Sequence, residues 1–296
     1  MMPFRRARGW WLLALTVACE RAKNPSPADS ATIKPAGSAD STAAPRASTW
    51  NSSAGPVLLV TSEDPARAFI VVPDSAATDA TLAALPHPAD VTLFSRAGTV
   101  QTAQLPEVNE TGACPAAALT GAPPPRAWSI GFIGGVVAPL PIDSIESIGA
   151  ADSSALVVWM NRLASALPND SAGRFSGLPF VVRGLWRFTV PSGPRVVVGS
   201  LVRQINQEAT PLQERTFLVA EQTTTDSSYA TVYSERRYGD EETIQNTEVL
   251  AGALIGANRT PTIVVARDFG DANAFGFIER SDGRWRIRWT SARRHC

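Results

Sequence analysis

The sequence predicts a mainly β protein of antiparallel hairpins, with one amphipathic helix at about residues 152–167. Two observations lead to this fold class. From Val57 onward, short apolar runs alternate with clusters of turn residues, which is typical of strands. These runs also follow one another closely enough to pair as hairpins, which favours antiparallel sheets over βαβ units. The pattern leaves open whether the hairpins form propeller-like sheets or a sandwich.

Five hairpins are expected where two apolar runs flank a short segment rich in Asp, Pro, Ser or Gly. The expected pairs are 57–60 with 69–72, 91–94 with 99–105, 180–190 with 195–205, 216–221 with 229–235, and 262–266 with 274–279. A last strand is expected at 285–290. The proline-rich stretch 114–126 is expected to be an irregular loop.

One segment carries apolar residues at helical spacing. They recur at i, i+3, i+4, i+7 and i+11, namely Leu156, Trp159, Met160, Leu163 and Leu167. Asp152 is a suitable N-cap, and Pro168 ends the pattern. The apolar stripe predicts a helix that covers one face of a sheet, and a lipid or ligand surface is the alternative.

A weak internal repeat links two of the expected strands. Thr216–Glu221 and Thr262–Arg267 are similar at an offset of 46 residues, and a period in the forties is typical of four-stranded propeller blades. The phrases PTIVVARD (261–268) and FGFIERSDGRWRIRW (275–289) resemble a degenerate FG-GAP or VCBS propeller repeat. That family binds calcium through an Asp-rich loop, whereas the matching loop here, 257–261, has no carboxylate. The resemblance therefore implies an architecture and no ligand, and independent use of common turn residues is the alternative explanation.

The N-terminus has the parts of a bacterial export signal. Arg5, Arg6 and Arg8 precede an apolar run, Trp10–Ala18, which is shorter than the roughly 20 residues of a membrane-spanning helix. The five residues ending at Cys19, Leu-Thr-Val-Ala-Cys, resemble the lipobox of bacterial lipoproteins. This resemblance implies a lipid on Cys19 and a place in the bacterial cell envelope, at the outer membrane or facing the periplasm. An ordinary secretory signal is the alternative.

This signal sets the expected domain organisation. Residues 1–19 are the signal peptide, and residues 20–56 are a disordered tether, since 24 of these 37 residues are Ala, Ser, Pro or Thr and cannot form a core. Residues 57–296 are expected to form the globular β domain. One division of that domain is into two lobes, 57–145 and 178–296, joined by the helix.

Charge, motif and cysteine content indicate which ligands and covalent links to expect. Lys plus Arg and Asp plus Glu both number 27, so no basic field predicts nucleic-acid binding. No cofactor is expected, because the sequence has neither a phosphate-binding Gly-rich loop nor zinc-type Cys/His spacing. If Cys19 carries lipid, Cys114 and Cys296 remain, and export favours a disulfide between them. Two free thiols are the alternative.

The last expected strand alternates arginine with apolar residues. Trp285, Ile287 and Trp289 are expected on the core face and the arginines on the other. The basic patch predicted there consists of Arg284, Arg286, Arg288, Arg293 and Arg294. An anionic envelope glycan or an acidic protein would fit it, and a solvated strand face paired with acids such as Glu279 is the alternative.

Candidate metal and catalytic groups are few. Asp268, Asp271 and Asn273 offer calcium-type oxygen ligands in one loop, although the same residues are common in hairpin turns. There is no G-x-S-x-G motif, and the two histidines are His87, between prolines, and His295. The sequence therefore favours a lipid-anchored, non-enzymatic binding or structural module. An envelope hydrolase acting on glycan or peptide through unidentified carboxylates is the alternative.

Overall fold

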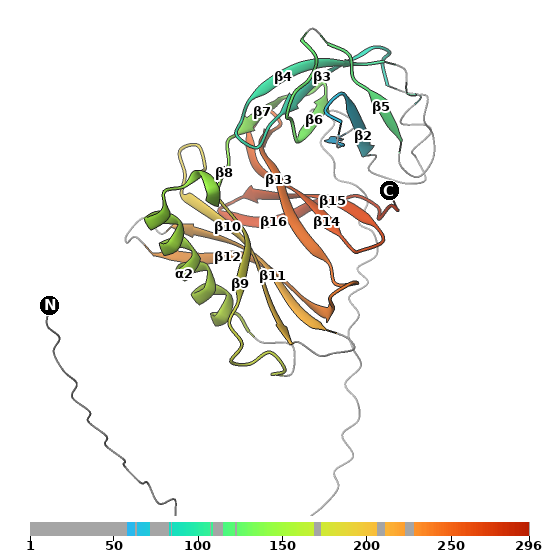
Figure 1. The fold of residues 1–296 in the computed structure, drawn as a ribbon. Helices are drawn as coiled ribbons and strands as arrows, with labels where there is room; N and C mark the ends of the chain where they lie inside the picture. The colour runs from blue at the N-terminus through green and yellow to red at the C-terminus, as the bar shows by residue number, and fades with distance from the viewer. Residues whose placement is uncertain are drawn as a thin grey trace, which may run out of the picture. The chain divides into compact units, whose positions relative to one another are not determined.

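The computed structural model describes residues 58–295, apart from 63, 72–82, 84, 107, 109–114, 122, 169–172, 206–210 and 223–227. Within these residues the chain forms three antiparallel sheets and one long helix, α2 (Ala150–Ala166), as Figure 1 shows. The prediction of a mainly β protein of antiparallel strands with one helix is confirmed.

Sheet A is a six-stranded sheet that curls until its edges meet. Its order is β4-β3-β6-β1-β2-β5. The strands are β1 (Leu58–Thr61), β2 (Arg67–Val71), β3 (Ala89–Phe94), β4 (Val100–Leu105), β5 (Ala116–Ala118) and β6 (Ile130–Ile133). Just after β5, Thr120 pairs with Gln104 of β4 through two backbone hydrogen bonds of 2.8 and 2.9 Å. The curled sheet encloses an apolar cluster that includes Leu59, Val91 and Trp128.

Sheets B and C each consist of four consecutive strands and one short added strand. Sheet C has the order β12-β11-β10-β9-β8 and sheet B the order β16-β15-β14-β13-β7. The strands of sheet C are β8 (Asp143–Ser144), β9 (Val181–Thr189), β10 (Arg195–Ile205), β11 (Leu212–Gln222) and β12 (Tyr229–Asp240). Those of sheet B are β7 (Val137–Leu140), β13 (Asn246–Ile255), β14 (Thr260–Asp268), β15 (Asn273–Ser281) and β16 (Arg284–Thr290).

The two four-stranded units correspond strand for strand at a spacing that differs from the expected repeat. β9 and β13 begin at residues 181 and 246, and β10 and β14 at residues 195 and 260, which is 65 residues apart in both cases. The 46-residue offset instead aligns β11, a third strand, with β14, a second strand. The two similar segments therefore occupy different positions in their sheets.

The segment after sheet A contributes an edge strand to each of the other sheets. β7 pairs with β13 and β8 pairs with β9, and Ile142 between them is buried in the core shared by sheets B and C. Gly252 of β13 permits this approach, because a Cβ there would lie 2.4 Å from the carbonyl oxygen of Leu140. Residues 137–144 thus belong to sheets that are formed mainly by the second half of the chain.

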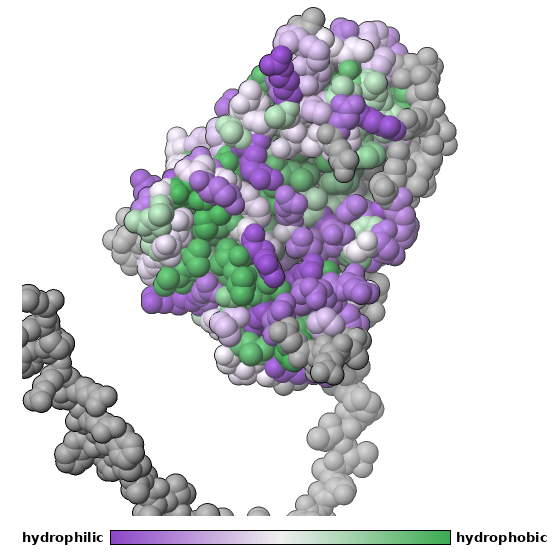
Figure 2. All heavy atoms as spheres, viewed as in Figure 1, coloured by the Kyte–Doolittle hydropathy of each residue, from purple (hydrophilic) through white to green (hydrophobic). Residues whose placement is uncertain are grey.

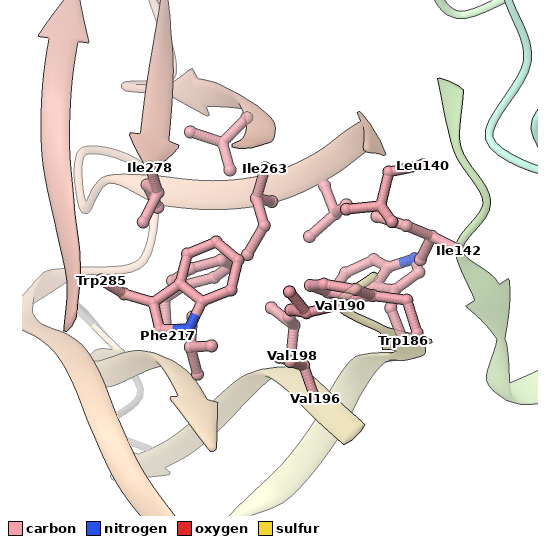
Figure 3. Close-up of a cluster of buried hydrophobic side chains, with 14 of the residues drawn as sticks. Leu140, Ile142, Trp186, Val190, Val196, Val198, Phe217, Ile263, Ile278 and Trp285 are labelled. Atoms are coloured by element: carbon pink, nitrogen blue, oxygen red, sulfur yellow. The ribbon is translucent and has the colours of Figure 1, made fainter. Parts of the chain in front are cut away.

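Sheet B is the middle layer of the three sheets. One face contributes Ile263 and Trp285 to a core shared with sheet C (Figure 3). The other face contributes Val264 and Phe277 to a core shared with sheet A, where the ring centroids of Phe277 and Phe132 are 6.4 Å apart. Burial of each such side chain contributes about 1.5–3 kcal/mol, so the three sheets stabilise one another.

Helix α2 covers the remaining face of sheet C. Leu156, Met160 and Ala164 are buried against strand residues such as Leu185 and Leu218. Two of the five residues of the predicted stripe, Leu156 and Met160, are therefore buried core residues that cover a sheet.

The start of α2 corrects one prediction. The N-cap is Gly149, and Asp152 lies in the first turn. Its carboxylate is 3.9 Å from the guanidinium of Arg187, a position in which the helix dipole also favours a negative charge. The helix ends at Ala166, before Pro168, as expected.

The five expected hairpins are all present. In the turn between β3 and β4, Gly98 has a φ of +86°, a conformation that favours glycine. The stretch expected to be an irregular loop instead contains β5, which pairs with β2.

The predicted facing of β16 is wrong in part. Trp285 and Trp289 are both buried, but on opposite faces of sheet B, and Ile287 is 43% exposed. Trp289 changes face because of a β-bulge, in which Arg288 is an extra residue between the Ile287 and Trp289 pairs with β15. A bulge reverses the alternation beyond it.

Candidate functional site

A cavity of about 270 Å³ lies where sheets A and B meet. Strands β1 and β2 form one side, and β13, β14, β15 and the residues after β16 form the other. The apolar lining includes Val60, Phe69, Val71, Leu250, Ala266 and Phe275. The polar lining consists of Thr61, Asn273, Ser291 and Arg294.

The segment after β16 forms one wall because it is hydrogen-bonded along β15. Ser291 donates its backbone N–H to the Phe275 carbonyl at 2.8 Å, and its hydroxyl accepts the Phe275 N–H at 2.9 Å. Arg294 and Asn273 exchange two backbone hydrogen bonds of 2.7 and 2.9 Å. The side chain of Arg294 is therefore fixed at the cavity by a defined backbone position.

Arg294 gives the cavity a positive charge. Burial lowers the pKa of its guanidinium, but an arginine stays charged at physiological pH. Binding cavities are typically apolar with a few fixed polar groups. A cation beside an apolar lining suits a ligand with an apolar body and an anionic end.

The cavity brings together residues that the sequence suggested for two different roles. Asn273 came from the candidate calcium loop and Arg294 from the candidate basic patch. Pro115, which also lines the cavity, directly follows Cys114. Cys19, Cys114 and Cys296 themselves lie outside the described residues.

The other arginines of the predicted patch lie apart from the cavity lining. Arg284, Arg286 and Arg288 are exposed on β16, at the edge of sheet B. The Arg293 guanidinium lies 3.8 Å from the centre of the Phe269 ring.

Glu279 lies opposite this strand and pairs with it. Its carboxylate is 3.7 Å from the Arg288 guanidinium, and it is the cross-strand neighbour of Arg286. Burial raises the pKa of Glu279, and the charges of Arg288 and Arg286 oppose that rise. Arg286 also donates to the Ser281 hydroxyl at 3.1 Å.

The candidate calcium loop is a hydrogen-bonded turn. The Asp268 carboxylate accepts the Gly270 N–H at 2.8 Å, and the Asp271 carbonyl is 2.8 Å from Nδ1 of His295. Among the described residues, no three His, Cys, Asp or Glu side chains come together as a group that could hold a metal ion.

Two glutamates on sheet C form ion pairs with arginines on sheet B. The Glu221 carboxylate accepts hydrogen bonds from Arg280 at 2.6 and 3.1 Å and from the Trp285 indole at 2.7 Å. Glu235 pairs with Arg267 and accepts a hydrogen bond from the Tyr233 hydroxyl.

The pKa of the Tyr233 hydroxyl is strongly raised. Burial and the neighbouring Glu235 carboxylate raise this pKa, so the hydroxyl stays protonated and acts as a donor. Because both glutamates are held by such partners, these two clusters join the sheets.

A third glutamate is buried beneath α2. Glu214 of β11 is fully buried and lies between two arginines, with distances of 3.0 Å to Arg203 and 3.2 Å to Arg236. Arg236 also donates to the Ala164 carbonyl near the end of α2 at 2.9 Å. The triad thus fixes the helix on sheet C.

Sequence reasoning missed the cavity, because its lining comes from residues 60 to 294 and no local pattern marks it. No helix of the described part has the length and apolar character needed to cross a membrane.

No protein-family model, curated protein or solved structure matches this chain. Its function must therefore be inferred from its own residues.

Proposed function

We propose that the protein is a lipid-anchored protein of the bacterial cell envelope whose β domain binds an anionic amphiphile. The observation that carries this proposal is the apolar cavity between sheets A and B, with Arg294 in its wall. Apolar side chains from both sheets would hold the ligand's chain, and the guanidinium would hold its anionic end.

Binding is favoured over hydrolysis by the positions of the buried carboxylates. Glu214, Glu221 and Glu235 are each paired with an arginine, and none of the three lines the cavity. A glycosidase-type mechanism needs two carboxyl groups that flank the substrate, whereas the described lining of the cavity contains neither Asp nor Glu.

The exposed arginines of β16 support a second, weaker contact with an anionic envelope glycan or acidic protein. Arg284 and Arg286 lie beside Arg288 on the edge strand of sheet B. This contact would be electrostatic and therefore sensitive to salt.

The Ala266→Leu variant is expected to bind decanoate at least roughly tenfold more weakly than the unmodified protein, a loss of about 1.4 kcal/mol. Ala266 lines the cavity and is half-buried, so a larger side chain fills the space without entering the core. Isothermal titration with decanoate measures the change. The Arg294→Gln variant should weaken decanoate binding and leave decanol binding unchanged.

The control is Ala230→Leu, at an exposed alanine of β12 outside the cavity. It should leave decanoate binding unchanged. If the unmodified protein, Ala266→Leu and Ala230→Leu all bind decanoate with equal affinity, the cavity is not the binding site. If both leucine variants lose the same affinity, the effect is not specific to the cavity.

Cys19→Ser is expected to release the protein from membranes into the soluble envelope fraction. The reason is that a bacterial lipoprotein is held by several acyl chains on this one cysteine, and loss of all of them removes the anchor. Fractionation after a high-salt wash measures the distribution. Continued membrane attachment of the variant would contradict the lipid anchor while leaving the cavity proposal intact.

A further inference from the structure

A groove of about 380 Å³ lies between helix α2 and β9. One wall contains Ile145, Val157 and Asn161, and the other is the strand segment from Phe180 to Leu185. Figure 2 shows hydrophobic residues gathered over α2 and β9 on this face of the molecule, with hydrophilic residues around them. The groove shares no lining residue with the cavity between sheets A and B.

The strand wall of the groove is an open edge of sheet C. β8 covers β9 only at Trp186 and Arg187. The chain then turns into the 3-10 helix Ile145–Ser147, which lies beside the groove without pairing with β9 as a strand. Within the described residues, Val181–Leu185 have backbone hydrogen bonds only toward β10. An open strand edge of this kind is a template for another extended segment.

The open edge of β9, Val181–Leu185, carries a positive charge. Arg183 is exposed and is the extra residue of a β-bulge between the Val182 and Gly184 pairs with β10. It has no ion pair within the described part of the chain, whereas Arg187, at the covered end, is 3.7 Å from Asp143. Burial lowers the pKa of the neighbouring Arg215, the charges of Asp268 and Glu241 oppose this, and the charge of Arg183 has the smallest effect and lowers it. A negative group opposite Arg183 would give this exposed arginine an ion-pair partner.

We propose that this groove binds an extended peptide segment of a partner protein, which pairs with β9 as an added strand. Its alternate apolar side chains pack against Val157 and Ile145, and a carboxylate lies opposite Arg183. Main-chain hydrogen bonds to the open edge provide affinity, and the apolar groove and the arginine provide selectivity.

The same charge disfavours a second copy of this chain as the occupant. Two β9 edges that pair about a two-fold axis place the same surface against itself. Each Arg183 would then lie close to its symmetry mate, where like charges across a strand pair repel.

The test uses fluorescein-labelled eight-residue peptides that alternate valine with threonine and carry one central glutamate. Fluorescence anisotropy with the purified protein compares this peptide with a counterpart in which lysine replaces the glutamate. A third peptide retains the glutamate but has N-methylated backbone amides on one edge, which removes its ability to pair as a strand. The glutamate peptide is expected to bind roughly fivefold more tightly than the lysine peptide. The N-methylated peptide is expected not to bind.

Arg183→Glu is expected to reverse the preference, so that the lysine peptide binds more tightly. The matched control is Arg195→Glu, at an exposed arginine of β10 outside the groove, which should leave the preference unchanged. Both arginines are exposed, so thermal unfolding should be the same in the two variants.

Three results would overturn the proposal. The first is no binding of either peptide, and the second is equal binding of the N-methylated peptide. The third is dimerisation in sedimentation that Arg183→Glu changes and the peptides do not, which would assign the edge to a second copy. Decanoate binding is measured on the same variants and should not change, so failure here is distinguishable from failure of the cavity proposal.

Discussion

Replacing Glu214 with glutamine is expected to lower the free energy of unfolding by about 3–5 kcal/mol. The carboxylate is fully buried between the guanidinium groups of Arg203 and Arg236, whose side chains are only 8% and 10% exposed. The variant keeps the size of the side chain but leaves two buried positive charges without their counter-ion. Urea denaturation of the full chain, followed by tryptophan fluorescence, measures the loss.

The packing around the triad hinders movement of the Arg203 and Arg236 side chains into solvent. The Arg203 guanidinium lies 4.7 Å from the centre of the Phe180 ring, and Arg236 is hydrogen-bonded to the Ala164 carbonyl of α2. Moving Arg236 into water would therefore break a contact that holds the helix on sheet C, and moving Arg203 would break its contact with the Phe180 ring. We expect the helix to loosen first, which circular dichroism at 222 nm would detect.

The matched control is Glu248→Gln. Glu248 pairs with Arg96 at 3.3 Å, but the two side chains are 57% and 34% exposed. An exposed pair contributes roughly 0–1 kcal/mol, so this variant should be nearly as stable as the unmodified protein. Similar losses in both variants would contradict a special role for the buried triad.

The sequence predicts the hairpins because each depends on neighbouring residues. In the turn of β3 and β4, Ser95 and Gly98 are three residues apart and form their own hydrogen bond of 3.0 Å. The pairings of β6 with β1 and β3, and of β7 and β8 with later strands, join distant segments. They depend on closure of the shared cores, and strands as short as β8 have no pattern of their own.

The position of Trp289 shows that one inserted residue can make a prediction of strand facing from alternation wrong. The sequence of β16 alternates without a break, so nothing in it marks Arg288 as a bulge. The bulge lets β16 contribute Trp285 to one core and Trp289 to the other. Its position follows from the pairing of Trp289 with Phe277, whose ring centroids are 5.0 Å apart.

Part of the buried triad was readable from the sequence. Arg203 shares a strand face with Leu201, and Glu214 shares one with Leu218, because residues two or four apart in a strand lie on one side. Charged residues on an apolar face indicate a buried pair, but which partners meet depends on the register of β10 with β11. The cavity gave no such signal, since its walls are assembled from both halves of the domain.

If Cys114 and Cys296 form the proposed disulfide, its reduction is expected to lower the free energy of unfolding by about 4–5 kcal/mol in the chain-entropy model. The bridge would close a loop of about 180 residues, and the entropy lost by the unfolded chain grows with loop length. Described residues near the two cysteines motivate this test. Pro115 follows Cys114 and Arg294 precedes Cys296 by two positions, and both line the same cavity.

The bridge would also hold the proposed binding cavity together. Ser291 and Arg294 form a wall of the cavity through hydrogen bonds to β15, and a covalent link would fix the end of that wall to the segment before β5. Reduced protein should therefore bind decanoate more weakly than oxidised protein, even at temperatures where both are folded.

Single and double serine variants, made with Cys19→Ser so that two cysteines remain, distinguish the bridge from two free thiols. If the cysteines are bridged, Cys114→Ser, Cys296→Ser and the double variant lose the same stability, because each removes the same bond. The unreduced parent then has no titratable thiol, and each single variant has one. Additive stability losses, or two titratable thiols in the unreduced parent, would show that the cysteines are separate, and the C-terminal wall of the cavity would then depend on its hydrogen bonds to β15 alone.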